Sequence, residues 1–290
     1  METKNRLIIF DSNSVIHRAF HALPPLTTKN KEPVGAVYGF LLVFLKAIKE
    51  FQPNFIAACF DVKGPTFRHE KYAQYKAQRP KAPPELYQQI PIVKSVLSGF
   101  SVPVYEKQGF EADDLIGTIS KIASQSIQDV ETVIVSGDSD NFQMINSRVG
   151  VYALRKGVKD TVLYNEETVA SKYQGLKPIQ LIDYRALRGD ATDNIPGVRG
   201  IGEKTAISLL SQFGTLENIY QKLEEVRPRT KELLCQYKED AFASKYLATI
   251  DQNVPIDFKL EDCLWSVYNK DKARESLEQL GFHSLITRLP

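Results

Sequence analysis

Leu7-Ile-Ile-Phe-Asp11 is a short apolar run that ends in an aspartate, and the same pattern returns twice along the chain. Phe55-Ile-Ala-Ala-Cys-Phe60 leads into Asp61, and Val133-Ile-Val-Ser-Gly137 leads into Asp138. Apolar runs of this length are typical of strands that are buried on both faces of a parallel sheet. Because the carboxyl ends of parallel strands open onto one crevice, we expect the three aspartates to meet there.

Strands alternate with helices in the first half of the chain. A polar turn is expected after the first strand, followed by a helical pattern over Val34–Phe51, and a further helical pattern covers Glu85–Leu97. A short strand is expected at Val102–Tyr105, and a helix opens at Glu111. This alternation predicts an α/β fold with a mostly parallel central sheet and helices on both of its faces.

Helical patterns dominate from residue 176 onward, without a further convincing strand. The candidate helices are Ile179–Arg188, Glu203–Phe213, Leu216–Leu223, Thr230–Tyr237 and Lys270–Leu280. We therefore expect two regions, an α/β core over residues 1–175 and a helical region over residues 176–290.

Opposite charges are segregated along the chain, although its formal net charge is only +2. Between positions 63 and 81 a single acid, Glu70, stands among many basic and aromatic residues, namely Lys63, Phe67, Arg68, Lys71, Tyr72, Tyr75, Lys76, Arg79 and Lys81. Such a mixture suits nucleic acid, whose backbone attracts cations and whose unstacked bases lie on aromatic rings. A solvated surface loop is the alternative, and at this point it stays open.

Further acids follow the strand-terminal aspartates in short segments. They are Glu111, Asp113, Asp114, Asp140, Asp190 and Asp193. So many anions in one pocket would repel one another strongly unless hard, oxygen-preferring cations such as magnesium or manganese bind among them. Taken singly, each acid has a simpler interpretation, because Asp190 and Asp193 could cap helices and helix N-termini commonly attract acids such as Asp113 and Asp114.

A glycine-rich turn, Ile195-Pro-Gly-Val-Arg-Gly-Ile-Gly-Glu-Lys-Thr205, precedes the helical pattern that starts at Glu203. Its glycines allow close backbone approach, and the free N–H groups of a helix N-terminus attract phosphate. Arg199 and Lys204 would strengthen such a site, as expected of a helix-hairpin-helix that grips a DNA backbone without reading its bases. The alternative is a packing corner with glycine at a helix C-cap.

Three segments closely resemble the bacterial 5′ nucleases and flap endonucleases, most narrowly the N-terminal 5′→3′ exonuclease domain of bacterial DNA polymerase I. They are Phe110-Glu-Ala-Asp-Asp114, Gly137-Asp-Ser-Asp140 and the longer stretch Tyr184–Thr205. The resemblance spans nearly all 290 residues. It implies a PIN-like nuclease core with an arch segment at about residues 63–84, and a helix-hairpin-helix (helix-three-turn-helix) motif at about residues 184–213.

The resemblance also implies a role for each residue that matches a family motif. One metal ion would be held by Asp11, Asp61, Glu111, Asp113 and Asp114. A second would be held by Asp138, Asp140, Asp190 and Asp193. Lys76 and Arg79 would be catalytic. DNA would contact Tyr75, Lys76, Arg79, Gly197, Arg199, Gly200, Gly202 and Lys204. Arg18 and Arg68 are further candidate DNA contacts on account of their charge, with solvated surface cations as the alternative. The implied cofactors are two or more Mg²⁺ ions, with Mn²⁺ as a substitute, and K⁺ at the helix-hairpin-helix.

The function expected from this resemblance is a metal-dependent 5′→3′ exonuclease or flap endonuclease that cleaves phosphodiester bonds near the 5′ end of branched or nicked DNA. Its expected partners are DNA with a 5′ flap, a nick or a single-strand junction, and the RNA primer hybrids of replication and repair. The alternative is a module that binds DNA junctions without cleaving them. An aspartate-based phosphatase is disfavoured, because that chemistry usually needs a second acid where Asn13 stands.

Composition favours a cytoplasmic protein that does not enter membranes. The three cysteines lie far apart, no apolar run approaches the roughly 20 residues of a membrane span, and the strand beginning at Leu7 leaves no room for a signal peptide. We expect a monomer that is fused to a DNA polymerase or acts with one; length alone does not distinguish these cases. The histidines show no metal-ligand pairing and are assigned structural or surface roles, namely His17, His21, His69 and His283.

Overall fold

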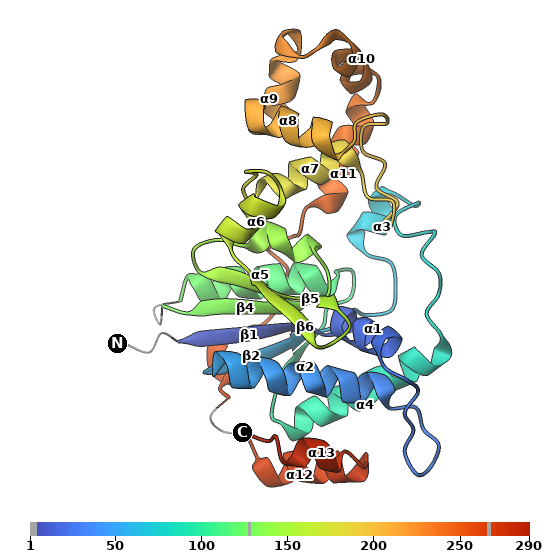
Figure 1. Cartoon of the computed structure of the whole chain (residues 1–290), viewed down its shortest axis with the longest axis vertical. Helices are drawn as coiled ribbons and strands as arrows, with labels where there is room; N and C mark the ends of the chain where they lie inside the picture. Colours follow the sequence, from blue (N-terminus) through green and yellow to red (C-terminus); the bar gives the residue numbers. More distant parts are fainter. Residues whose placement is uncertain (1–4, 127–128, 266–267) are drawn as a thin grey trace.

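The computed structural model describes residues 5–126, 129–265 and 268–290, and its centre is a six-stranded sheet (Figure 1). In sheet order the strands are β3 (Val104–Tyr105), β2 (Phe55–Cys59), β1 (Arg6–Asp11), β4 (Glu131–Ser136), β5 (Val149–Lys156) and β6 (Asp160–Tyr164). Neighbouring strands pair in parallel, except that β6 runs antiparallel to β5. The predicted mostly parallel sheet is confirmed.

Two apolar cores lie on the two faces of this sheet, because successive strand residues point to opposite sides. Ile8 and Phe10 of β1 belong to one core, together with α1 (Ser12–Ala22), α2 (Gly35–Phe51) and α4 (Pro84–Gly99). Leu7 and Ile9 belong to the other core, beneath α5 (Ala112–Ser124) and the 3₁₀ helix η1 (Asp140–Met144). Helices therefore cover both faces, as predicted.

Helix α1 replaces the polar turn that was predicted after the first strand. Asp11 caps this helix, since its Oδ1 accepts a hydrogen bond from the N–H of Ser14 at 3.2 Å. The helix buries Val15, Ile16 and Ala19 against the core. The prediction was wrong because the polar residues around Ser12 hide this narrow apolar stripe, and N-cap chemistry starts a helix where a turn also fits.

A separate helical region with its own core follows the sheet. Its elements are α6 (Glu166–Lys172), α7 (Gln180–Arg188), α8 (Glu203–Phe213), α9 (Leu216–Gln221), η2 (Leu223–Glu225), α10 (Pro228–Gln236) and α11 (Lys238–Ala248). Helix α8 has the predicted bounds, and α7, α9 and α10 differ from the predicted helices by one or two residues at most of their ends. The sequence pattern did not reveal α6, α11 or the β5–β6 hairpin.

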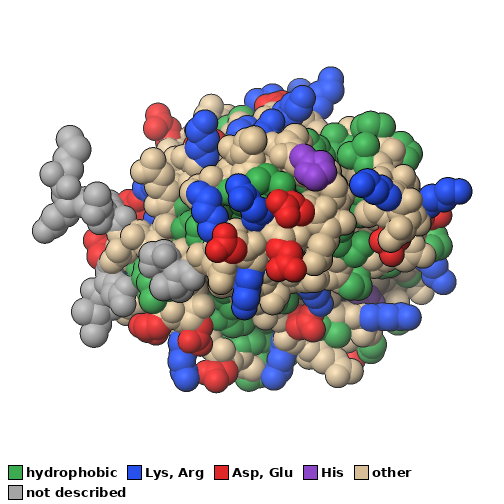
Figure 2. Space-filling model, turned by 90° about the horizontal axis from the view of Figure 1, so that it is seen from below, with side chains coloured by type: hydrophobic (Ala, Val, Ile, Leu, Met, Phe, Trp, Pro, Cys, Tyr) green, Lys and Arg blue, Asp and Glu red, His purple; other side chains and the backbone are tan. Residues whose placement is uncertain are grey.

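The last forty or so residues return to the sheet and its helices instead of extending the helical region. Ile250, Val254 and the 3₁₀ helix η3 (Leu260–Cys263) pack beneath α5, while α12 (Lys270–Gln279) and α13 (His283–Ile286) pack near α4 at the far end of the molecule (Figure 1). The predicted division at residues 175 and 176 stays a prediction, but the region 176–290 does not form a single body. Seen onto the end that carries α12 and α13, the surface mixes charges of both signs (Figure 2).

The arch segment, residues 63–84, leaves β2 and passes beside the carboxyl ends of the strands. It contains one short helix, α3 (Phe67–Lys71). Above the sheet in the view of Figure 1, it approaches the helical region. The neighbours of β1 are β2 and β4, so the direction of strand order changes at β1, where a crevice forms in open α/β sheets. The helices of the described residues include none that is both long and apolar enough to cross a bilayer.

Candidate active site

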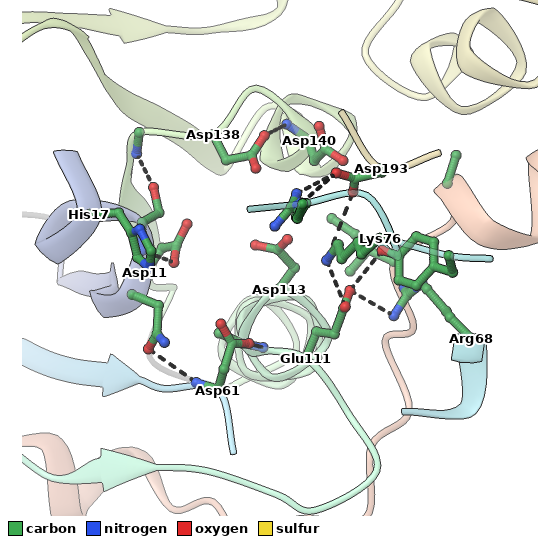
Figure 3. A pocket seen from close by; sticks show the side chains of 18 of the residues that line it. Asp11, His17, Asp61, Arg68, Lys76, Glu111, Asp113, Asp138, Asp140 and Asp193 are labelled. Carbon is green, nitrogen blue, oxygen red and sulfur yellow. Dashed lines mark hydrogen bonds and ion pairs between the residues drawn. The ribbon is translucent and has the colours of Figure 1, made fainter. Parts of the chain in front are cut away.

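A cavity of about 420 Å³ opens where β1, β2 and β4 end, and acids surround it (Figure 3). Seven carboxylates line it: Asp11, Asp61, Glu111, Asp113, Asp138, Asp140 and Asp193. They come from three strand ends, from the start of α5, from η1 and from the loop after α7. The expected convergence of distant acids is therefore present.

Asp11 lies at the floor of the cavity with only 3% of its surface exposed. Burial raises the pKa of its carboxyl to about 7, although a 2.5 Å hydrogen bond from the Ser136 hydroxyl opposes this shift. The negative charges of Asp138 and Asp61 raise the pKa further. A carboxylate in this position gains strongly from a nearby cation.

Asp113 and Asp140 face the same electrostatic strain. Burial raises the pKa of both groups well above the usual range, and the charges of neighbouring aspartates add to the effect. Asp113 is held by a 2.8 Å hydrogen bond from the Asn141 amide. Burial also opposes ionisation of Asp138, but hydrogen bonds from Asp140 and the charge of Arg185 outweigh it, so that the pKa of Asp138 is lowered. The cluster therefore combines Asp138, which ionises readily, with Asp113 and Asp140, whose ionisation is opposed by burial and by neighbouring negative charge.

Asp61 and Glu111 join the end of β2 to the start of α5. Asp61 accepts a 2.8 Å hydrogen bond from the N–H of Ala112, while its own N–H donates to the side chain of Asn13. Burial works against ionisation of Glu111, but the charges of Lys76 and Arg68 outweigh it and lower its pKa. These contacts fix the acids before any ligand is present.

Two cations of the arch segment reach in among the acids (Figure 3). The Lys76 ammonium lies 2.6 Å from Glu111 Oε1 and 3.8 Å from Asp193 Oδ2, and the Arg79 guanidinium pairs with Asp193. The backbone N–H of Lys76 also donates to the carbonyl of Asp193 at 2.9 Å. The arch segment is thus bound directly to the loop that follows α7.

The donor set fits hard divalent cations. Oxygen is the only donor type among the seven carboxylates, and their mutual repulsion is the strain that Mg²⁺ or Mn²⁺ relieves. Over residues 5–126, 129–265 and 268–290, no three His, Cys, Asp or Glu side chains converge closely enough to enclose an ion alone. Mg²⁺ commonly keeps several water ligands, so one or two carboxylates are enough to hold it.

Asp114 and Arg68 form a buried pair at the wall of the cavity, which Arg68 lines. Both oxygens of Asp114 accept from the Arg68 guanidinium at 2.7 and 2.8 Å, and the side chains are 0% and 2% exposed. Arg68 also donates to the carbonyls of Leu247 and Thr249. The predicted roles of Asp114 as a metal ligand and of Arg68 as a DNA contact are therefore not available in this structure, because each would have to break this pair.

Tyr75 lies inside the protein. It is 3% exposed, and its hydroxyl donates to Glu111 Oε2 at 3.1 Å. Its ring packs edge-on against His69. Tyr75 lines the cavity with little exposed surface, and its hydroxyl helps to orient Glu111. Contact of this ring with DNA stays a prediction.

The glycine turn divides into a packed part and an open part. A Cβ at Gly197, where φ is +63°, would lie 2.3 Å from the backbone nitrogen of Gly189, and the Gly197 N–H donates to the Ser244 hydroxyl. Gly197 therefore serves close backbone packing. Gly202 faces open space, and Arg199 and Lys204 are exposed beside the N-terminus of α8. This exposed part stays a candidate for phosphate contact. Gly200 is exposed as well and belongs to it, and its φ of +92° favours glycine at this position.

Four cavity residues of α1, Asn13, Ser14, His17 and His21, were not predicted from the sequence as part of the site. His17 and His21 line the cavity together with Asn13, and the two histidines lie four residues apart, on one face of the helix. Burial lowers the pKa of His17, as do the charges of His21 and Arg79. Their spacing is a visible signal, but it has meaning only on a helix, and a turn was predicted here. The expected phosphate contact Arg18 also lines the cavity and donates to the carbonyl of Gly137 at 2.9 Å.

Asp190 lies outside the cavity lining. Its backbone pairs with Ile195 across the loop, and its Oδ1 accepts from the N–H of Thr192. The nearest cation to its second oxygen is Arg185, at 4.0 Å. Of the nine predicted ligands, seven therefore line the cavity, Asp190 borders the cluster through Arg185, and Asp114 pairs with Arg68.

Known families match the two parts of the chain. The 5′-3′ exonuclease N-terminal resolvase-like domain matches residues 6–174, and the 5′-3′ exonuclease C-terminal SAM fold matches residues 176–271. DNA polymerase I of Caldicellulosiruptor bescii is 43% identical over 98% of this chain and 33% of that protein. DNA polymerase I of Bacillus subtilis is 39% identical over 100% of this chain and 33% of that protein. The chain thus spans about a third of the length of these relatives.

Solved structures share the fold. T5 5′-exonuclease with bound divalent metal ions (zinc) is 21% identical, with a TM-score of 0.70 over 95% of this chain and 100% of that chain. The catalytic core of Rad2 in complex with a DNA substrate is 19% identical, with a TM-score of 0.62 over 99% of this chain and 93% of that chain. The resemblance inferred from the three sequence segments is confirmed.

The buried pair of Arg68 and Asp114 makes a stability prediction. We expect Arg68→Ala to lower the free energy of unfolding by about 3–5 kcal/mol, because the buried Asp114 carboxylate loses its countercharge and keeps only the backbone N–H donors of Glu111 and Asp251. Urea unfolding followed by circular dichroism measures this loss. Lys231→Ala is the matched control, since its ion pair with Glu224 is exposed and should contribute about 0–1 kcal/mol. Equal losses in the two variants would contradict a structural role for Arg68.

Proposed function

The chain belongs to the 5′-3′ exonuclease family, and from this premise we propose that it is a divalent-metal-dependent nuclease that cleaves phosphodiester bonds near the 5′ end of branched or nicked DNA. One observation carries the proposal: seven carboxylates and the cations Lys76 and Arg79 surround a single cavity at the ends of the central strands. This combination suits hydrolysis of a phosphodiester, which needs both held cations and positive charge at the phosphoryl oxygens.

Two divalent ions are proposed to bind here. The first would be held by Asp11, Asp61, Glu111 and Asp113, and the second by Asp138, Asp140, Asp190 and Asp193, with some of these acids acting through bound water. When bound, ions at such a site lower the pKa of a water nucleophile and stabilise the charge on the leaving oxygen. Mg²⁺ is the proposed ion, with Mn²⁺ as a substitute; K⁺ at the turn before α8 stays a prediction.

The side chains of the protein supply the remaining requirements. Arg79 is 42% exposed and planar, so it suits a two-point contact with phosphate oxygens, whereas Lys76 offers a compact charge beside Glu111. Asp11 and Asp138, fixed by Ser136 and by the backbone of Asp140, keep their oxygens directed by hydrogen bonds. The arrangement is preorganised, so little reorganisation is required when the scissile phosphate arrives.

Substrate selection is proposed to involve two surfaces. The arch segment would engage a single-stranded 5′ end, and the exposed turn with Arg199 and Lys204 would hold the duplex backbone at the α8 N-terminus. The backbone hydrogen bond from Lys76 to Asp193 joins the arch segment to the loop that leads into this turn. Because the matched relatives are about three times longer than this chain, polymerase fusion, RNA primer removal and a monomeric state are proposals as well.

Asp138→Ala tests the proposed catalysis. We expect cleavage of a 5′-labelled flap in Mg²⁺ to fall by a factor of a hundred or more, because the variant loses a carboxylate that ionises readily, while DNA affinity measured in Ca²⁺ stays near normal. Asp257→Ala, an exposed acid away from the cavity, is the control. Near-normal turnover of Asp138→Ala would contradict the site. Wild-type protein that binds the flap tightly but never cuts it would instead be a junction-binding module.

Added Mg²⁺ should stabilise the protein more at pH 8 than at pH 5. In the folded protein without metal, Asp11 has a pKa of about 7, raised from 3.8, so its contribution to stability is full below pH 4 and is lost as pH rises through 7. Binding of Mg²⁺ needs the ionised carboxylate and reverses this loss at high pH. At a Mg²⁺ concentration a hundredfold above its Kd, the gain in the free energy of unfolding is about 2.7 kcal/mol. Melting temperatures with Mg²⁺, and with K⁺ at equal ionic strength, measure it; equal shifts at both pH values would refute the metal site.

Lys76→Ala separates catalysis from binding. Since the ammonium lies inside the carboxylate cluster, we expect its loss to slow single-turnover cleavage at least tenfold while flap affinity in Ca²⁺ changes less than threefold. Lys81→Ala removes an exposed charge from the same basic segment outside the cavity lining and should alter affinity and its salt dependence only. If the two variants lose rate and affinity in the same proportion, Lys76 is an ordinary phosphate contact.

A further inference from the structure

Arg185 on α7 is a buried cation in contact with acids from two different elements. Its side chain is 9% exposed, and its guanidinium pairs with Asp140 Oδ1 and lies 3.4 Å from the Ser139 hydroxyl. Beside this contact, Nε of the same side chain lies 4.0 Å from Asp190 Oδ2. Within the described residues, its remaining nitrogen, Nη1, is buried and has no hydrogen-bond partner.

The two acids depend on Arg185 to different extents. Asp140 belongs to η1, directly after β4, and among the described residues Arg185 is the cation that pairs with it. Asp190 lies in the loop after α7, where one oxygen already accepts from Thr192 and the other faces Arg185. Asp140 is part of the sheet layer and Asp190 of the helical region, so their relative position is set where α7 crosses η1.

We propose that Arg185 is a positioning residue that fixes the separation and orientation of Asp140 and Asp190. This inference rests on the proposed function, in which these acids hold the second divalent ion. Arg185 does not touch the scissile phosphate in this role. It acts by holding the carboxylates of Asp140, next to the sheet, and Asp190, in the helical region, in a fixed relative position.

The guanidinium group suits this task for a geometric reason. Its Nη2 and Nε groups lie side by side on one edge of a rigid plane at a fixed spacing, so a single side chain can orient two neighbouring carboxylates at once. A lysine would place the same charge at one point and would hold one acid at most. Beside Arg185 lies a second cavity of about 230 Å³, lined by Tyr184, Arg188 and Glu203 among others, which would give a shorter chain room to move.

A competing effect has the opposite sign. Arg185 occupies an oxygen of Asp140 and adds positive charge near the cluster, so it also opposes the entry of a divalent ion. If this repulsion dominated, removing the guanidinium would tighten ion binding. If orientation dominates, as we infer, its removal weakens ion binding, and a lysine that keeps the charge does not restore it. The sign of the change and the behaviour of lysine therefore decide between the two effects.

Binding of Mn²⁺ to the full chain without DNA tests the inference. Free Mn²⁺ is followed by electron paramagnetic resonance in the wild type, Arg185→Lys and Arg185→Met. We expect one ion to bind normally and another to bind at least tenfold more weakly in both variants. Arg188→Met is the matched control, because Arg188 lies one turn along the same helix, is exposed and packs over Tyr184. It should bind Mn²⁺ as the wild type does.

Cleavage supplies a second readout. The Mg²⁺ concentration for half-maximal cleavage of a flap should rise about tenfold in Arg185→Lys, with DNA affinity in Ca²⁺ unchanged. Unaltered Mn²⁺ binding in both variants, tighter binding, or full rescue by lysine would each overturn the positioning role while leaving the proposed function intact. Absence of Mn²⁺ binding by the wild type would overturn both. Should Arg185→Met fail to fold, the charge-retaining lysine variant decides the question.

Discussion

Repulsion among the carboxylates at the carboxyl ends of β1, β2 and β4 is the constraint on which the rest of the structure depends. Parallel pairing places Asp11, Asp61 and Asp138 at one edge of the sheet, and burial raises the cost of ionising several acids of the cluster. The fold offsets this cost with cations that come from outside the sheet. A site built in this way is stable only when its charge is balanced, which explains why basic side chains lie so close to acids.

Each of these cations ties a different part of the chain to the cluster. Lys76 and Arg79 bring the arch segment to Asp193, and Arg185 brings α7 to Asp140. Lys245 of α11 pairs in turn with Asp183 of α7, which connects the helical region internally. The cations that balance the acids therefore also set the position of the arch segment and the helical region. The same ion pairs contribute to the electrostatics of the site and to the overall architecture.

The sequence reveals the convergence of acids because strand direction fixes where strand-terminal residues go. It does not separate Asp113 from Asp114, since both stand in the first turn of α5; about 100° of helical rotation turns one into the cavity and the other toward Arg68. Burial was equally hidden for Tyr75 and Gly197, whose neighbours come from distant segments. His17 and His21 were missed because their spacing matters only once α1 is known to be a helix. Local patterns thus predict the elements and the edge of the sheet, while pairing across elements decides each side chain's role.

Arg68 and Arg79 show how far this distinction reaches. Both belong to the basic arch segment, and composition alone gives them the same meaning. Arg68 is 2% exposed and donates hydrogen bonds to Asp114, Glu111 and two backbone carbonyls, so moving it would disrupt the junction of α3, α5 and α11. Arg79 is 42% exposed and pairs with a single acid at the cavity wall. A phosphate can replace that one partner at little cost, whereas a single ligand cannot replace the five hydrogen bonds that hold Arg68. Whether a basic residue can bind substrate therefore depends on how many protein contacts it must break to do so. Arg68 and Arg79 lie close together in the sequence but differ greatly in this number.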